Sequence, residues 1–215
     1  MSCTAVRGAC TPDVATRPGV ANAGPAYGRE VTEQQRYDVI RTEPSFELRH
    51  YPAHVVAEIE VAGTFESAGN TAFRPLVGYI GGRNESSTGL AMTAPVIQRR
   101  DDAEPHAVET TTADVGEGRY VVSFVLPDDV TASTVPTPSD PAVHVRVVPD
   151  EYAAVARFSG RWTSSSYRTR VDALVLAVAA AGLVTTGPAR FARFDPPWTP
   201  WFRRRNEVVL PVASP

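Results

Sequence analysis

The chain has 215 residues, of which 43% are hydrophobic, and its formal net charge at pH 7 is −3. A folded chain of this length buries roughly 70% of the surface that its unfolded form exposes, which is enough for one large domain or two small ones. The composition is typical of an ordinary soluble protein, and it argues against an intrinsically disordered chain and against a protein that coats nucleic acid.

The N-terminal segment has neither strand alternation nor helical periodicity, so residues 1–36 are predicted to form a disordered arm. The arm lacks the apolar stretch of a secretory signal, which favours a cytoplasmic protein. Its two cysteines, Cys3 and Cys10, are expected to be free thiols because no further metal ligands lie nearby. No apolar run in the chain reaches the roughly 20 residues that a membrane span needs.

The ordered region is predicted to begin at Tyr37 with strands, followed by a helix and more strands. The predicted strands of this part are residues 37–41, 46–51, 55–61, 90–100 and 120–126. An i, i+3, i+4, i+7 pattern that ends at Ile80 predicts a helix from about Glu66 to the pair Gly81-Gly82. Pro95 favours an edge position or a bulge for the strand that contains it.

A similar series of elements follows in the second half. The predicted strands there are residues 143–148, 152–158, 190–194 and 206–212. A helical pattern over 171–178 is preceded by Ser164, Ser165 and Ser166, which are good N-cap residues. Two strand-rich halves with one helix each predict an α+β fold, with one curved sheet or open barrel and the helices outside.

The two halves also share punctuation at one offset. Arg49, Pro52 and Gly63 have counterparts 97 residues later, at Arg146, Pro149 and Gly160. We therefore interpret residues 37–215 as a single domain made of two pseudo-repeats, at about 37–126 and 143–212. The repeats differ at His50, where the second copy has Val147.

Four stretches in chain order resemble the SOUL heme-binding family, across about residues 37–212. They are Phe46-Glu47-Leu48-Arg49-His50-Tyr51, Phe73-x-x-Leu76-x-x-Tyr79-Ile80-x-Gly82-x-Asn84, Leu90-Ala91-Met92-Thr93-Ala94-Pro95-Val96, and Pro196 to Phe202 continuing into Arg204-Arg205-Asn206-Glu207-Val208. The resemblance implies a duplicated β-α-β-β unit that forms a distorted antiparallel β-barrel flanked by two helices. It also implies noncovalent binding of heme or a related tetrapyrrole, and it does not imply an enzyme.

His50 is the candidate metal ligand. Because side chains alternate along a strand, His50 shares a face with Phe46 and Leu48, and its imidazole is expected among apolar side chains. Some members of the family use a histidine of the matching stretch as the axial ligand of heme iron, so the resemblance implies this role for His50. From the residue alone, a core histidine bonded to a backbone carbonyl stays an open alternative.

Four further residues are candidates for contact with heme, and two of them, Phe46 and Leu48, would supply apolar contacts. Met92 could be a soft sixth ligand of the iron, although a methionine that fills a gap in the core is the more common case. Arg49 could bind a propionate through its fork of donors, with a solvated charge as the alternative. There is no Cys-x-x-Cys-His motif, so covalent attachment of heme is excluded.

The segment before the last strand is rich in aromatic and basic residues. Trp198, Trp201 and Phe202 are expected to close the barrel, with a role in lining a groove for a planar ligand as the alternative. The run from Arg203 to Arg205 looks like a nucleic-acid patch. The net charge is negative, however, so we expect structural ion pairing with Glu207 and no nucleic-acid partner.

Two other functions are compatible with the sequence. The duplicated β-α-β-β architecture also resembles the effector-binding domains of some bacterial transcription regulators, which bind small molecules. An enzyme that acts on a tetrapyrrole or a small electrophile would need an acid or base such as Glu58, Glu60 or Tyr79, but no paired arrangement of such residues is evident.

Overall fold

The computed structural model describes residues 32–101 and 116–215. Residues 1–31 of the predicted arm, which include Cys3 and Cys10, lie outside the described residues. Residues 32–36 were also expected to belong to the arm, but Glu33–Gln34 form strand β1, and the Gln35 backbone N–H donates to the Ala94 carbonyl at 2.8 Å. The folded unit therefore begins before the boundary expected at Tyr37.

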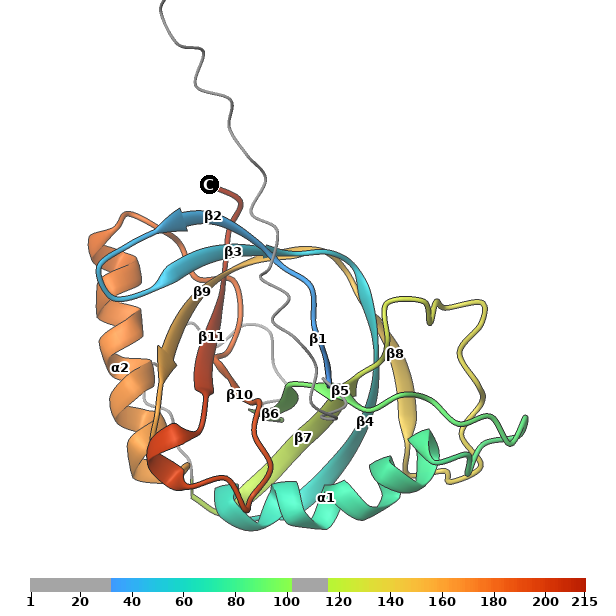
Figure 1. Cartoon of the computed structure of the whole chain (residues 1–215). Helices are drawn as coiled ribbons and strands as arrows, with labels where there is room; N and C mark the ends of the chain where they lie inside the picture. Colours follow the sequence, from blue (N-terminus) through green and yellow to red (C-terminus); the bar gives the residue numbers. More distant parts are fainter. Residues whose placement is uncertain (1–31, 102–115) are drawn as a thin grey trace, which may run out of the picture. The chain divides into compact units, whose positions relative to one another are not determined.

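The described residues form an α+β fold with one large sheet and two long helices (Figure 1). The strands are β1 (Glu33–Gln34), β2 (Asp38–Thr42), β3 (Glu47–Tyr51), β4 (His54–Gly63), β5 (Thr93–Ala94), β6 (Val96–Arg100), β7 (Gly118–Val125), β8 (His144–Val148), β9 (Glu151–Phe158), β10 (Arg190–Arg193) and β11 (Asn206–Val212). The helices are α1 (Phe65–Ile80), α2 (Ser164–Ala180) and the short 3-10 helix η1 (Trp201–Arg203). None of these helices is long and apolar enough to cross a lipid bilayer.

Nine strands form the large sheet in the order β2-β3-β9-β11-β10-β6-β7-β4-β8, and every pair in it is antiparallel. The order has two ends, β2 and β8, so hydrogen bonding does not close the sheet into the expected barrel. The sheet is curved, and both helices cover its outer face (Figure 1). Strands β1 and β5 form a separate parallel pair.

Helix α1 begins where the sequence supplies a cap. The Thr64 hydroxyl accepts from the Ser67 backbone N–H at 3.2 Å, and the Ser67 hydroxyl accepts from the Thr64 backbone N–H at 3.0 Å, which satisfies two donors at the helix start. The helix ends at Gly81, and the next residue, Gly82, has a φ of +102°, a conformation that favours glycine. Helix α2 is capped by Thr163 rather than by the three serines that follow it.

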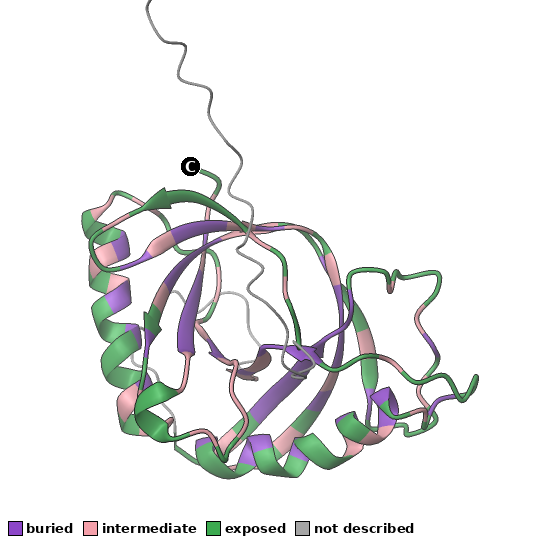
Figure 2. Cartoon of the chain, in the orientation of Figure 1, coloured by how far each residue is buried: buried purple, intermediate pink, exposed green. Residues whose placement is uncertain are grey.

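The core lies mainly between the outer face of the sheet and the two helices. Figure 2 shows the buried residues along the strands and on the sides of the helices that face the sheet. The inner face carries a smaller apolar cluster of five buried residues, namely Tyr51, Ala153, Val155, Ala192 and Val209. The two faces of the sheet therefore offer different environments, and the alternation of each strand decides which environment a side chain meets.

Pro95 divides the strand that was predicted over residues 90–100. The structure has β5 at Thr93–Ala94 and β6 at Val96–Arg100, on either side of the proline. A proline cannot donate to the ladder of a sheet, which accounts for the break at this position. Strand β6 then pairs with β7 on one side and with β10 on the other, so it joins the two halves of the sheet.

Candidate functional site

Of the five predicted site residues, Leu48, Arg49 and His50 lie on strand β3, and Phe46 directly precedes it. Because side chains alternate along a strand, these residues are divided between the two faces of the sheet. Phe46 and Leu48 are buried in the large core between the sheet and the helices. Arg49 is buried on the inner face, beside Tyr51. His50 points to the same side as Leu48, as the alternation of the strand predicted.

His50 is a partly exposed imidazole at the end of the outer core. Its side chain is 27% exposed, and its Nε2 lies 3.6 Å from Oδ2 of Asp150. The ring packs against Tyr152, with 4.9 Å between the ring centroids, because the two residues are direct partners in the β3–β9 ladder. One ring nitrogen of His50 therefore lies beside a carboxylate, and the ring is accessible from solvent.

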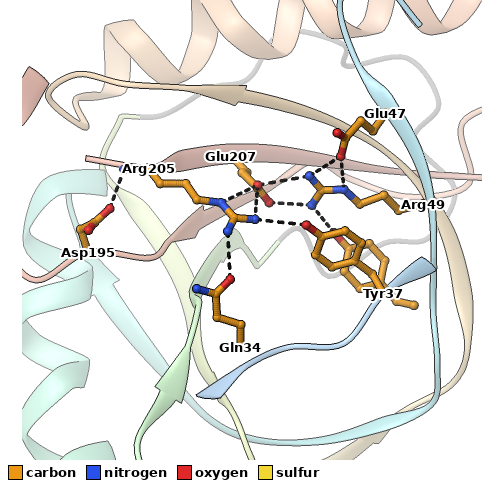
Figure 3. A network of polar contacts seen from close by, with 8 residues as sticks. Gln34, Tyr37, Glu47, Arg49, Asp195, Arg205 and Glu207 are labelled. Atoms are coloured by element: carbon orange, nitrogen blue, oxygen red, sulfur yellow. Dashed lines mark hydrogen bonds and ion pairs between the residues drawn. The ribbon is translucent and has the colours of Figure 1, made fainter. Parts of the chain in front are cut away.

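Arg49 belongs to a network of ion pairs on the inner face (Figure 3). Its guanidinium donates to both oxygens of Glu207, with Nη1 to Oε2 at 2.9 Å and Nη2 to Oε1 at 3.3 Å. Arg205 reaches the same carboxylate from the other side, with Nη2 2.7 Å from Oε1. Glu47 is a further partner of Arg49, at 2.7 Å from Nη2. The predicted ion pairing with Glu207 is confirmed for Arg205, whereas Arg204 donates to the carbonyls of Thr199 and Pro197.

Arg49 is a cation whose charge is balanced by the carboxylates of Glu47 and Glu207. Burial alone would lower the pKa of Arg49, but the hydrogen bond and the charge of Glu207, together with Tyr51, outweigh burial and raise it. Burial raises the pKa of Tyr51 to about 12, so its hydroxyl stays protonated at neutral pH. Arg49 has the role of a structural ion pair here, and its donors are not free for a propionate.

A pocket on the inner face is lined by ten residues, namely Gln35, Tyr37, Tyr51, Pro95, Ile97, Arg190, Ala192, Phe194, Glu207 and Val209. Its free space is enough for about one water molecule. A flat macrocycle needs far more room than this. The geometry therefore places any tetrapyrrole outside this pocket.

Met92 and the aromatic segment lie away from β3. Met92 precedes β5, whose partner is β1, and its side chain is 38% exposed. Trp198, Trp201 and Phe202 are 82%, 51% and 57% exposed, so the expectation that they close the barrel is wrong. These rings lie on the segment around η1, where three prolines and a 3-10 turn hold the chain outside the sheet.

Sequence reasoning did not find Asp150, the inner-face partners Tyr37 and Tyr51, or Gln34, which accepts from Arg205 at 2.9 Å. Asp150 had one usable signal, because it follows Pro149 in the turn that matches the turn after His50. Within the described residues, no group of three or more histidine, cysteine and acidic side chains is placed to hold a metal ion.

His54 gives this region a pH dependence. Its Nδ1 lies 2.9 Å from the Pro52 carbonyl oxygen, and its Nε2 lies 3.1 Å from the side-chain nitrogen of Gln35. Burial lowers the pKa of His54 below its ordinary value of 6.5. As the pH falls through about 6.5, the unfolded chain takes up a proton before the folded one, and the free energy of unfolding decreases until the pH is below the folded pKa.

We expect urea unfolding to show this loss of stability as the pH is lowered from about 7 through 6.5. His54→Gln should reduce the loss, because the variant has no imidazole to protonate. His144→Gln is the control, since His144 is exposed and should leave the dependence unchanged. Identical pH dependence in wild type and His54→Gln would contradict the assignment.

The fold and site together define a class: α+β proteins in which two helices cover the outer face of one large antiparallel sheet. The chain belongs to the SOUL heme-binding protein family, whose model matches residues 32–211. It is similar to heme-binding protein 1 of Xenopus tropicalis, with 26% identity over 165 residues, 76% of this chain and 82% of the relative. It is also similar to heme-binding protein 2 of Mus musculus, with 29% identity over 161 residues, 74% of this chain and 73% of the relative.

Solved structures with the same fold include proteins of other kinds. The C-terminal domain of EcmrR matches with a TM-score of 0.58 and 16% identity, over 83% of this chain and 99% of that chain. A hydrolase from Listeria innocua matches with a TM-score of 0.57 and 11% identity, over 79% of this chain and 92% of that chain. At these identities the similarity concerns the fold alone.

Proposed function

We propose that this protein binds heme, or a closely related tetrapyrrole, noncovalently. The observation that carries the proposal is the match to the SOUL heme-binding family over residues 32–211, together with two relatives that are named heme-binding proteins. Carriage, buffering and sensing of heme all begin with this binding step. The proposal does not depend on any catalytic group.

Within this proposal, His50 is the axial ligand of the iron. The residues present fit such a ligand, because the imidazole is accessible, a carboxylate lies beside Nε2, and Tyr152 supplies an aromatic surface. Heme would supply the iron that the imidazole coordinates. Phe46 and Leu48 would hold β3 in place, since both side chains are buried in the core between the sheet and the helices. Met92 stays a candidate for a second contact, whereas Arg49 keeps its structural role.

We also infer that the fold arose by duplication of a β-α-β-β unit, at about residues 37–126 and 143–212. Without β2, the sheet reads β3, β9, β11, β10 from one end and β8, β4, β7, β6 from the other. Each strand of the first half thus has a counterpart of the second half at the mirrored position. Helix α1 follows the consecutive strands β3 and β4, and α2 follows β8 and β9, so the helices have matching places in the two halves, which supports the duplication.

Titration with hemin tests the proposal. The wild type is expected to give a sharp, shifted Soret band, and His50→Ala should bind hemin at least about 10-fold more weakly with a different Soret position. His144→Ala is the matched control, because it removes an exposed imidazole from β8 and should bind like the wild type.

Each outcome of the titration has a separate meaning. A wild-type protein without any spectral response to hemin would overturn heme binding. Unchanged spectra in His50→Ala would remove His50 from the site and leave heme binding intact. Binding of a cationic drug-like compound by a protein that ignores hemin would instead support the effector-binding alternative.

A further inference from the structure

Arg193 is a cation at the junction of the two helices. It lies on β10 and points to the outer face, because Phe191 belongs to the outer core and Ala192 to the inner cluster. Its guanidinium carbon lies 3.6 Å from the centre of the Trp162 ring, and its Nη2 donates to the Gln98 side-chain oxygen at 3.0 Å.

The fold leaves room for this guanidinium. A Cβ atom added at Gly69 of α1 would lie 2.4 Å from Nη2 of Arg193, so any larger residue at this position would displace the group. Protein atoms enclose the guanidinium on most sides, and burial lowers the pKa of Arg193 to about 9. The side chain is therefore still charged at neutral pH, although burial deprives this charge of most of its hydration.

In the part of the chain that the structure describes, Arg193 has no acidic partner, in contrast to several other arginines of the sheet. Arg49, Arg146 and Arg190 each form an ion pair, with Glu207, Glu58 and Glu151 respectively. Arg193 forms none within the described residues, and its Nε is buried without any hydrogen-bond partner. A buried donor without an acceptor is costly, so such a group is a candidate for contact with a ligand.

The surroundings favour an anion with a flat apolar body. Glu66 on α1, an acid at the helix junction, already accepts from the Ser164 backbone N–H at the start of α2, at 2.8 Å. Trp162 offers a ring beside the guanidinium. The exposed aromatic segment adjoins the same turn, because the Gly160 backbone N–H donates to the Trp201 carbonyl at 3.0 Å.

We propose that Arg193 is the anion receptor of a second ligand site, which takes a carboxylate carried on a flat aromatic body. The carboxylate would accept a hydrogen bond from Nη1, which is not bonded to Gln98, and its charge would give Arg193 the acidic partner that the described part of the chain does not provide. The aromatic body would pack against Trp162 and the neighbouring exposed rings.

This site is separate from the one proposed around His50. Three strand spacings separate β3 from β10 in the sheet. His50 is paired with Tyr152 near the start of β9. Arg193 is paired with Asn206 of β11, which in turn is paired with Phe158 at the end of β9. Standard strand dimensions put the two side chains roughly 20 Å apart or more. One macrocycle therefore does not bind His50 through its iron and Arg193 through its edge.

The probe for this site is 2-naphthoate, with the neutral 2-naphthamide as its control. The readout is the ¹⁵N–¹H resonance of Arg193 Nε, which is assigned by its absence in Arg193→Met. We expect 2-naphthoate to shift this resonance and to bind at least about 10-fold more tightly than 2-naphthamide, because only the carboxylate pairs with the guanidinium. Arg193→Met should abolish this preference, while Arg193→Lys should keep part of it.

Folding and the His50 site are controlled separately. Arg193→Met keeps most of the side-chain volume and removes an unpaired charge, so its thermal midpoint should be no lower than that of the wild type. His50→Ala should bind 2-naphthoate like the wild type, whatever its response to hemin. Equal binding of naphthoate and naphthamide, no shift of the Arg193 resonance, or full naphthoate binding by folded Arg193→Met would each overturn the proposal.

Discussion

Glu207→Gln is expected to lower the free energy of unfolding by about 3–5 kcal/mol. The side chain of Glu207 is 1% exposed and accepts from both Arg49 and Arg205, so its carboxylate neutralises two guanidinium groups. Glutamine has nearly the same shape but no charge, and the variant keeps two cations on the inner face with only the partly exposed Glu47 nearby. The expected loss is a large fraction of the roughly 5–15 kcal/mol that stabilises an ordinary domain.

Urea unfolding measures this loss, and Glu60→Gln supplies the matched control. Glu60 pairs with Arg119 on the surface, where both side chains are at least half exposed, so its loss should cost about 1 kcal/mol or less. The double variant Arg49→Met/Glu207→Gln should recover part of the stability, because it removes one of the uncompensated charges. Equal effects of Glu207→Gln and Glu60→Gln would show that the inner-face network is not a stabilising element.

The sequence was sufficient for most of the local structure. The helical spacing that ends at Ile80 predicted α1, and the glycine pair marked its end correctly. The same pattern was less accurate about the buried face, because Phe73 and Val77 are 46% and 38% exposed. Small residues such as Ala68 and Ala72 face the sheet instead, which brings the helix close to it. The hydrophobic periodicity therefore predicted the position of the helix better than it predicted which side of the helix packs against the sheet.

Strand alternation gave the correct faces for the residues around His50. It placed His50 with Phe46 and Leu48 and opposite Arg49, as the structure has them. What alternation could not give is the partner on the next strand. Arg49 meets Glu207 over a separation of 158 residues, and Arg193 meets Gln98 over 95 residues. These contacts depend on the strand order of the complete sheet, which no local pattern encodes.

The aromatic segment shows a different limit of sequence reasoning. Large apolar side chains are usually buried, and this tendency predicted that Trp198 and Trp201 close the barrel. Local backbone constraints prevail here, because the prolines and η1 keep the segment outside the sheet, where both rings are exposed. The general tendency of large apolar residues to be buried cannot predict an exposed aromatic segment, which is an exception to it.

Phe191→Ala is expected to destabilise the fold by about 3–5 kcal/mol, the range for a large aromatic residue removed from a core. Phe191 is fully buried and lies at the centre of an aromatic cluster. Four rings surround it at centroid distances of 5.3–6.2 Å, namely those of Phe65, Phe158, Trp162 and Tyr167. Because these rings belong to several different elements, the cavity left by alanine has little freedom to collapse.

The position of Phe191 makes this substitution a test of how the two halves depend on each other. Strand β10 pairs with β6 of the first half and with β11 of the second, and the rings around Phe191 come from both halves. Thermal unfolding followed by circular dichroism should therefore show one transition that moves to lower temperature as a whole. Leu176→Ala is the control, since that side chain is 72% exposed on α2 and its loss should change stability by about 0.5 kcal/mol or less. Two separate transitions in Phe191→Ala would instead mean that each half unfolds on its own, and a loss no larger than that of Leu176→Ala would contradict the role of this ring in the core.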